Sequence, residues 1–457
     1  MNIHPVFSSW LLRICGASLL AVALSACHPA SEDDGRIVLR YWEKWNGFEM
    51  EAMRAVVDDF NASQNRLRVE ISSVSQINRK LMLATSGGVP PDVAGLFAED
   101  IPIYAENNAL TPLDTLATQA GIRREDYLDA YWQLASHRGV LFGLPSTPNV
   151  SALVWNKKMF REAGLDPEQP PRSIAELEAF NEKILRRRPD GGIAQIGHLP
   201  NEPVWITPGW GFWFGARYWD GQANVAADSP EMRATFQWLR SYPERFGEQN
   251  LLALRDGFGS YASPQNPFMS GRVAMTLQGV WIYNFIKNYA PPDFEWGVAA
   301  FPSVDPERLP NVTQTDCDVL VIPVGSKHPR EAFEFMRYVN SQGPMEKFCL
   351  AQRKFSPLRR VSEDFYRRHP DPYVRVFAEL ASSPNVRFSP QMTTWNEYND
   401  DLTDATGRIM AGATDVEAVL RNVQRREQAH YDRARERWKR NSEALTAGWA
   451  SELKTGD

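Results

Sequence analysis

The sequence predicts an α/β fold built on a parallel sheet, because strand and helix patterns alternate along the chain from residue 36 onward. The chain has 457 residues, and at roughly 150 residues per domain this length allows two or three folding units. The hydrophobic share is 43% and the charged share is 23%. Both values are ordinary for a globular protein and argue against the disordered and fibrous classes.

The first block of elements begins with a predicted strand at residues 36–42. The helix that follows, residues 49–61, is amphipathic, since Met50, Met53 and Val57 recur near the i, i+3, i+7 spacing of one helix face. After it we expect a strand at 67–71, a helix at 78–85 that the glycines and prolines of 87–91 end, and an apolar strand at 91–97.

A second block begins near residue 143, with an expected strand at 151–155 and a helix at 157–163. Ser173 is the predicted N-cap of the next helix, residues 174–187, and Glu176 completes a capping box. The later predicted elements are a helix that starts at Ser229-Pro230, strands at 272–277 and 319–322, a helix at 330–340 and a long helix, rich in Arg and Glu, at 416–449.

The N-terminal segment has the pattern of an export signal. Residues 1–26 carry one basic residue, Arg13, and residues 14–26 form an apolar run that is too short to span a bilayer comfortably. The run ends in Leu24-Ser25-Ala26-Cys27, which resembles the bacterial lipobox, in which the cysteine becomes the acylated first residue of the mature chain. We therefore expect a signal peptide over residues 1–27, lipidation of Cys27 and a polar tether at 28–35; a plain secretory peptide is the alternative.

No later segment has 18 apolar residues in a row. The prediction is a protein exported to the bacterial cell envelope, in the periplasm or on the outer face of a membrane, and held there by its lipid anchor alone.

Charge and aromatic content narrow the function classes. The net charge is −6, which gives no general attraction to nucleic acid, so a nucleic-acid partner is not expected. Tryptophan occurs 15 times and aromatic residues make up 11% of the chain. An excess of Trp fits stacking on a flat ligand face, and it also fits ordinary use in a core.

Cys317 and Cys349 are the cysteines outside the N-terminal segment. They could form one disulfide in an oxidising compartment, and two buried reduced thiols are the alternative.

Searches for catalytic motifs favour no enzyme class. The seven histidines show no zinc-site spacing, and the phosphate-loop and nucleophile-elbow motifs are absent. We therefore expect no metal and no cofactor. Carboxylate pairs such as Glu99 with Asp100, or Asp316 with Asp318, could serve a glycosidase, which needs two carboxyl groups about 5–10 Å apart. With 56 acidic residues in the chain, such pairs also arise by chance.

Several segments, taken in order, are similar to the extracellular solute-binding proteins of sugar ABC importers, the class that includes maltose-binding protein. The segments are Ala109–Asp114, Gly143–Pro145, Leu153–Glu168, Phe268–Trp281 and Ile322–Pro329. The resemblance covers nearly all of residues 36–425. The chain departs from the family in its long charged tail after about Asn422, and at Thr315-Asp316-Cys317-Asp318, where the family more often has a Gly-rich turn.

This resemblance implies a periplasmic-binding-protein fold, with two discontinuous α/β lobes and a hinge. It places residues 36–149 and 278–350 in lobe 1 and residues 150–277 and 351–457 in lobe 2. The expected crossings between the lobes lie near 149–152, 276–279 and 350–354. The implied function is that of a monomeric binding protein, not an enzyme, which captures a carbohydrate in the cleft between the lobes and delivers it to the transmembrane subunits of an ABC permease.

The resemblance also implies the ligand contacts. Trp rings would stack on the apolar faces of pyranose rings, while carboxyl, amide and cationic groups would pair with the sugar hydroxyls. Trp281 and Trp395 match stacking residues of the family. The other expected contacts are Trp42, Glu43, Lys44, Trp45, Glu99, Asp100, Asn149, Glu202, Trp205, Trp210, Trp213, Asp316 and Arg359. As alternatives, the tryptophans could be core residues and the charged groups simple surface charges.

Two other functions stay open. The first is a surface-anchored glycoside hydrolase that uses two of the cleft acids. The second is a binder of a non-sugar solute such as a phosphorylated polyol, whose phosphate would call for Arg, Lys or a helix N-terminus in the cleft.

Overall fold

The computed structural model describes residues 35–454, without the side chains of residues 204–207 and 451–454. The predicted signal peptide and Cys27 lie outside the described residues. Within the described part, no helix is both long enough and apolar enough to cross a membrane.

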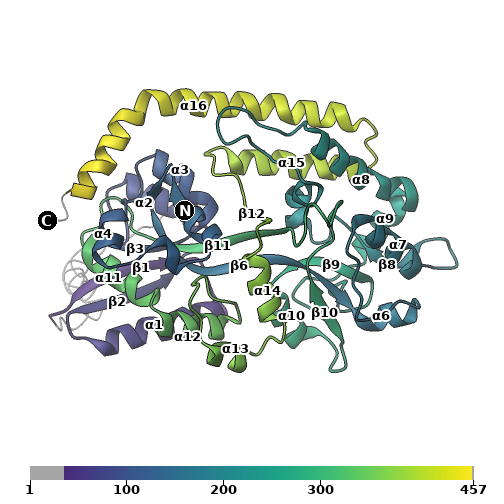
Figure 1. The fold of residues 1–457 in the computed structure, drawn as a ribbon, viewed down its shortest axis with the longest axis horizontal. Helices are drawn as coiled ribbons and strands as arrows, with labels where there is room; N and C mark the ends of the chain where they lie inside the picture. Colours follow the sequence, from purple (N-terminus) through teal and green to yellow (C-terminus); the bar gives the residue numbers. More distant parts are fainter. Residues whose placement is uncertain (1–34, 455–457) are drawn as a thin grey trace, which may run out of the picture.

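A mixed sheet runs through the length of the molecule (Figure 1), with the strand order β2-β1-β3-β11-β6-β9-β8-β7 along its main path. These strands are β1 (Ile37–Glu43), β2 (Leu67–Ser73), β3 (Val93–Phe97), β6 (Gly143–Asn156), β7 (Arg186–Arg187), β8 (Ile193–His198), β9 (Val273–Gly279) and β11 (Thr313–Val321). Two short strands join from the side: β10 (Trp296–Ala299) pairs with β6, and β12 (Val386–Arg387) pairs with β11. A separate hairpin consists of β4 (Ser136–His137) and β5 (Val140–Leu141).

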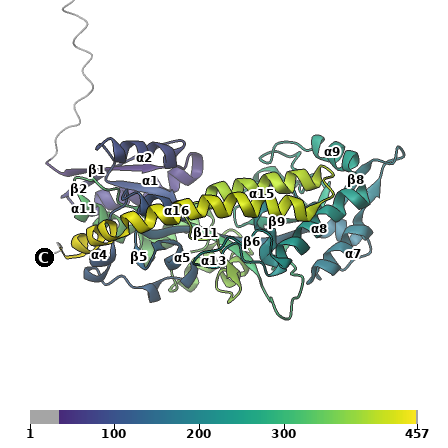
Figure 2. The same ribbon diagram turned by 90° about the horizontal axis from the view of Figure 1, so that it is seen from above.

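Helices cover both faces of this sheet (Figures 1 and 2). They are α1 (Gly47–Ser63), α2 (Ile77–Ser86), α3 (Ile101–Glu106), α4 (Asp114–Gln119), α5 (Asp129–Leu134), α6 (Lys157–Glu162), α7 (Ile174–Ile184), α8 (Pro230–Phe246), α9 (Glu248–Asp256), α10 (Ile282–Tyr289), α11 (Pro329–Val339), α12 (Gln342–Gln352), α13 (Glu363–Arg368), α14 (Val374–Ala381), α15 (Trp395–Met410) and α16 (Val416–Lys454). Three segments are 3₁₀-helical: η1 (Ala98–Asp100), η2 (Arg124–Asp126) and η3 (Val204–Phe214).

The parallel pairing expected from the alternating strands and helices is present in part of the sheet, which is mixed as a whole. β1 pairs in parallel with β2 and β3, and β8 pairs in parallel with β9. β6 and β11, however, run antiparallel to each other and to their other neighbours on the main path. The reason is that β6 carries the chain from one half of the molecule to the other and β11 carries it back, so the two strands point in opposite directions.

β6 joins the two halves by changing its partner. Residues 143–150 of β6 pair with β11, and residues 151–155 pair with β9. The crossing expected near 149–152 lies at this change, and the one expected near 276–279 lies at the end of β9. The crossing expected at 350–354 is wrong, because Phe355, Leu358 and Phe377 stay in the core of lobe 1. The chain enters the core of lobe 2 again only at Met392 and Trp395.

Two hydrophobic cores define the two lobes. The core of lobe 1 gathers β1, β2 and β3 with α1, α11 and α12, and includes Leu39, Val56 and Phe335. The core of lobe 2 gathers β8 and β9 with α7, α8 and α15, and includes Phe236 and Leu402. The fold is thus α/β and two-lobed.

Most predicted helices and strands are present, and the differences are local. Ser173 accepts a hydrogen bond from the backbone N–H of Glu176 at 3.1 Å, as predicted for an N-cap. The carboxylate of Glu176 accepts from the backbone N–H of Arg172 at 2.7 Å and not from Ser173, so the capping box is incomplete. The helix ends at Ile184 instead of 187, because the chain turns extended at Leu185 and enters β7.

The possible disulfide is also wrong, and the alternative of two buried thiols is confirmed. Cys317 lies in β11 and Cys349 lies in α12, and both are free and buried. Burial raises the pKa of each thiol well above its ordinary value.

Candidate functional site

A group of charged residues lies in lobe 1 where β1 and β3 end and β11 begins. Glu43 is the last residue of β1 and is fully buried. Its carboxylate accepts hydrogen bonds from the Tyr41 hydroxyl at 2.6 Å and from the backbone N–H of Lys44 at 2.7 Å. The ammonium of Lys44 lies 3.3 Å from Glu43 and 2.8 Å from Asp318 of β11. This side chain therefore connects two strands of lobe 1 through a buried ion pair on each side.

Opposing effects act on the pKa of Lys44. Burial lowers the pKa of its ammonium, but Asp318 and Glu43 raise it by more, so the net shift is upward and the group keeps its proton. The second oxygen of Asp318 accepts from the Thr147 hydroxyl at 2.8 Å. All polar groups of this cluster are satisfied inside the protein, which indicates a structural support more than a ligand contact.

Gly95 of β3 makes room for Glu43. A Cβ atom at Gly95 would lie 2.0 Å from Oε2 of Glu43. The carboxylate thus packs directly on the glycine backbone, and the small residue at this position is a requirement of the buried cluster.

Three carboxyl groups with raised pKa values lie beside this support. Burial raises the pKa of Glu99 to about 7, with a further contribution from Asp100, and burial raises the pKa of Asp100 to about 6. Burial and the charge of Glu99 raise the pKa of Asp316 well above its ordinary value. Glu99, Asp100 and Asp316 therefore form an acidic group at the edge of lobe 1.

Lobe 2 meets this acidic group through the start of α15. The indole N–H of Trp395 donates to the carboxylate of Glu99, and the Asn396 side chain hydrogen-bonds to Asp100. Trp395 belongs to the core of lobe 2, where its ring packs against Tyr218 and Tyr398 with centroids 5.7 and 5.6 Å apart. We call the surface at which these residues face each other the interlobe seam.

Trp281 stands on the same face of the sheet as Asp316. Asp316 pairs with Asn149 of β6, and Gly279 pairs with Ser151. Asn149 and Ser151 are two residues apart, so they and their paired residues point to one face. A Cβ atom at Gly279 would lie 2.2 Å from Cζ3 of Trp281, which means that the indole covers this glycine on that face.

A second polar group surrounds Trp281. The Tyr261 side chain lies beside Trp281, and burial and the charge of Glu202 raise the pKa of its hydroxyl. Burial raises the pKa of Glu202 itself, while Arg255 lowers it. Glu202 follows β8, and Trp281 follows β9. These strands are parallel, so their carboxyl ends bring the two residues to one edge of the sheet.

Buried polar atoms without a partner mark this region. Among the described residues they include Oδ2 of Asp100, Oδ1 of Asp316 and Oδ1 of Asn201. A buried acceptor that stays unpaired costs about 1–3 kcal/mol. Such unpaired oxygens are suited to accept hydrogen bonds from a hydroxyl-rich solute.

The structure separates the predicted contacts into site residues and others. Glu99, Asp100, Asn149, Glu202, Trp281, Asp316 and Trp395 gather at or beside the seam, and Trp42, Glu43 and Lys44 support it from within lobe 1. The side chain of Trp205 is not among those described.

Four predicted contacts are wrong. Trp210 and Trp213 are core residues of lobe 2, exposed by 1% and 0%, with indole N–H groups that donate to Pro200 and Val312. Trp45 packs against Phe348 in the core of lobe 1 at 5.4 Å. Arg359 is exposed and pairs with Asp129 at 3.3 Å. The sequence alone does not show which residues of an aromatic run are buried in a core. Nor does it show which charged residues form ion pairs on the surface.

Sequence reasoning missed several residues of the site. Asn396, Tyr261 and Asn201 contact the predicted residues or carry the unpaired atoms described above. Asn396 directly follows the predicted contact Trp395, so its position in the chain was a usable signal. Tyr261 lies in a loop that no pattern connects to β9.

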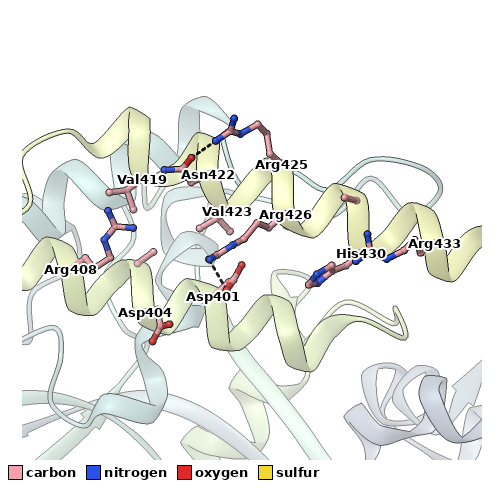
Figure 3. Close-up of a pocket in the computed structure, with 12 residues that line it drawn as sticks. Asp401, Asp404, Arg408, Val419, Asn422, Val423, Arg425, Arg426, His430 and Arg433 are labelled. Carbon is pink, nitrogen blue, oxygen red and sulfur yellow. Dashed lines mark hydrogen bonds and ion pairs between the residues drawn. The ribbon is translucent and has the colours of Figure 1, made fainter.

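The described residues contain no group of three side chains suited to hold a metal ion. A surface groove of about 680 Å³ lies between α15 and α16, away from the seam, and is lined by Asp401, Asp404, Arg408, Arg425, Arg426, His430 and Arg433 among others (Figure 3).

Comparison with known proteins identifies the family. The family model described as bacterial extracellular solute-binding protein matches residues 47–346. The chain belongs to this family. The resemblance found in the sequence is thereby confirmed.

Two relatives of this solute-binding protein are themselves named as binding proteins. The multiple sugar-binding protein of Streptococcus mutans is 25% identical over an alignment of 424 residues, which covers 88% of this chain and 93% of the relative. The sn-glycerol-3-phosphate-binding periplasmic protein of Yersinia pestis is 23% identical over an alignment of 276 residues, which covers 57% of this chain and 60% of the relative.

Solved structures share the fold of the solute-binding protein. The structure of CpMnBP1 with mannotriose bound has a TM-score of 0.73 and 26% identity, and the match covers 85% of this chain and 99% of that one. The sugar-binding protein MalE from Xanthomonas citri has a TM-score of 0.74 and 19% identity, with 88% and 99% covered.

Proposed function

We propose that this protein is the solute-binding component of an ABC importer and that its solute is a carbohydrate. The observation that carries the proposal is the arrangement at the seam, where Trp281 covers Gly279 on the sheet face that also holds Asp316, and Trp395 faces Glu99. An indole offers a flat apolar surface to a sugar ring, and unpaired carboxyl and amide oxygens accept hydrogen bonds from its hydroxyls.

The charge of the seam argues for a neutral solute over a phosphorylated one. Glu99, Asp100 and Asp316 lie together, and their raised pKa values reflect in part their mutual repulsion. The nearby cation, Lys44, is already engaged by Glu43 and Asp318. A phosphate would add a further negative charge beside these three acids, whereas the other cation of the site, Arg255, acts on Glu202.

The mechanism we propose is capture without chemistry. The lobes open about β6 and β11, a sugar enters between Trp281 and Trp395, and closure brings Trp395 and Asn396 back to Glu99 and Asp100. The closed, loaded form would then meet the transmembrane subunits of the permease as a monomer. The predicted division into lobes is kept as part of the proposal, with the change that residues 351–381 move with lobe 1, because their buried side chains belong to its core.

A solute screen by thermal shift tests the proposal. The full chain is heated with mannobiose, mannotriose, maltose, sn-glycerol 3-phosphate or glycerophosphocholine. A bound sugar at 100 times its Kd adds about 2.7 kcal/mol to the free energy of unfolding. Stabilisation by a neutral sugar supports the proposal, and stabilisation by the two phosphorylated solutes alone would contradict it. Recovery of each bound sugar with no newly released reducing ends supports binding without hydrolysis.

We also propose that Cys27 carries the lipid anchor, on the strength of the lipobox-like segment 24–27. Cells that make the protein are fed an alkyne-tagged fatty acid. Tagging of the full chain that is lost in Cys27→Ser supports the anchor, and equal tagging of both proteins would contradict it.

A further inference from the structure

Helix α16 is long enough to connect the two lobes by itself. It runs over 39 residues from Val416 to Lys454, which is about 58 Å at roughly 1.5 Å per residue. Figures 1 and 2 show it, in yellow, extending from α8 and α15 at one end of the molecule to α4 at the other.

The N-terminal half of α16 is fixed to lobe 2. Val419, Leu420 and Val423 lie in the core of that lobe. Arg426 forms an ion pair with Asp401 of α15 at 2.7 Å (Figure 3). The Gln428 amide accepts from the backbone N–H of Val225 and donates to the carbonyl of Ala223, both at 2.9 Å.

The C-terminal half of α16 is fixed to lobe 1. Trp449 is exposed by 2% and packs edge-on against Phe142, with ring centroids 5.1 Å apart. The guanidinium of Arg138 lies 4.0 Å from the centroid of the Trp438 ring. Trp438 and Leu445 are half-buried against the lobe 1 core. One face of the helix, with residues at 438, 445 and 449, is therefore apolar and directed at a different lobe from the first half.

Between these two attachments α16 passes over the seam. A cavity of about 150 Å³ is lined by Ile103 and Glu106 of α3, by Thr394 and Glu397 at the start of α15, and by Trp438 of α16 among others. The α3 residues follow directly after Asp100, and Thr394 directly precedes Trp395. The helix thus crosses the place at which the two lobes meet.

We propose that the C-terminal half of α16, residues 434–450, is an interlobe latch that must leave lobe 1 before the lobes can open. A helix is held at a fixed rise by its backbone hydrogen bonds, so it cannot lengthen when its two attachment points move apart. The half with fewer polar anchors would detach, and this is the half that holds lobe 1 through Trp438, Leu445 and Trp449. The latch follows from contacts of the free protein and does not depend on which solute is bound.

Distance measurements between the lobes test the latch without any solute. Lys80 of α2 and Lys183 of α7 are exposed residues in different lobes. Each is replaced by p-acetylphenylalanine and labelled with a ketone-reactive dye, so that the native cysteines stay untouched. Single-molecule energy transfer then reports the populations of closed and open molecules in the full chain.

We expect Trp449→Ala to raise the open population at least about fivefold, because the closed form loses an attachment that the open form does not have. The matched control is Glu443→Ala, an exposed position on the same half of α16, which should leave the distribution unchanged. If Trp449→Ala fails to fold, Leu445→Ala carries the test, since it removes only half-buried groups.

The same distribution in Trp449→Ala, Leu445→Ala and Glu443→Ala would overturn the latch, and α16 would then be a passive cover. A failed sugar screen would leave this result untouched, because the distances are measured on the free protein. The two proposals therefore fail independently.

Discussion

The indole of Trp395 and the carboxylate of Glu99 are hydrogen-bonded across the two lobes. Trp395 opens α15, which packs in lobe 2, whereas Glu99 lies in η1 directly after β3 of lobe 1. The contact joins a half-buried acid to a ring that is exposed by only 4%. Closure of the lobes therefore determines the surroundings of Glu99, and the ionisation of Glu99 should in turn affect closure.

The stability of the folded protein should fall as pH rises from about 4.5 to about 7. The pKa of Glu99 is raised from 4.5 to about 7, so the folded form holds a proton that the unfolded form has released in this interval. Folding then takes up a proton, and the free energy of unfolding declines with pH, by about 1–3 kcal/mol for this group. The side chain in Glu99→Gln cannot titrate. In this variant the denaturation midpoint, measured as a function of pH, should therefore change less between about pH 4.5 and 7. Glu125→Gln, at an exposed position, is the control and should keep the wild-type slope.

Trp395→Phe should raise the pKa of Glu99 further. The indole N–H stabilises the charged carboxylate, and its hydrogen bond is one of the effects that lower this pKa. Phe keeps an aromatic ring in contact with Tyr218 and Tyr398 but removes the donor. Carbon-13 NMR of labelled glutamate side chains would follow the titration. Trp210→Phe is the control, because the indole of Trp210 donates to the carbonyl of Pro200 and not to Glu99. This substitution should leave the titration midpoint of Glu99 unchanged. An unchanged midpoint in Trp395→Phe would show that the interlobe bond does not form in solution.

Lys44→Met should destabilise the protein by about 3–5 kcal/mol, because it leaves the buried carboxylates of Glu43 and Asp318 without their shared cation. Lys80→Met at an exposed position of α2 is the matched control, with an expected change within about 0.5 kcal/mol. Urea denaturation of both variants compares the two losses. Equal small losses would mean that the two acids are held neutral and that Lys44 contributes little.

The fold could be predicted much further than the site. Alternating patterns predicted the helices and most strands, because burial on one face leaves a period in the sequence. They could not give the direction of β6 and β11, since parallel and antiparallel strands have the same apolar run. Nor could they show that α16 divides its apolar residues between two lobes.

Within the proposed site, the predicted residues that gather at the seam stand next to strand ends, as Glu99 and Trp281 do. The prediction failed for Trp210 and Trp213, whose indole N–H groups donate to backbone carbonyls in the core. The sequence does not distinguish such a Trp from one that contacts a ligand. The unpaired oxygen of Asn201 depends on tertiary packing alone. No local sequence pattern predicts which buried hydrogen-bond acceptor will be left without a donor in the folded protein.

Cys317 and Cys349 should behave as protected thiols. Both are buried and free, and burial raises their pKa values, so little thiolate is present near neutral pH. We expect a reducing agent to leave the melting temperature unchanged and an aromatic disulfide reagent to reach both thiols only after unfolding. A fall in melting temperature on reduction would mean that the two cysteines are bonded in the exported protein.

Gly95→Ala should destabilise lobe 1 through one specific contact. The added methyl group would lie 2.0 Å from Oε2 of Glu43, whose side chain is held on its other side by Tyr41 and Lys44. We expect a loss of about 1–3 kcal/mol or more in the free energy of unfolding. In the Glu43→Ala background the clash is gone, so the same substitution should cost less, with a coupling of about 1 kcal/mol or more between the two sites in a double-mutant cycle. Gly343→Ala is the control: a Cβ there meets no atom within 4 Å, and its place in α12 favours Ala, so it should be neutral or stabilising. Additive effects at positions 43 and 95 would contradict the close packing of this carboxylate on the β3 backbone, and with it the support that holds the acidic edge of lobe 1 in place.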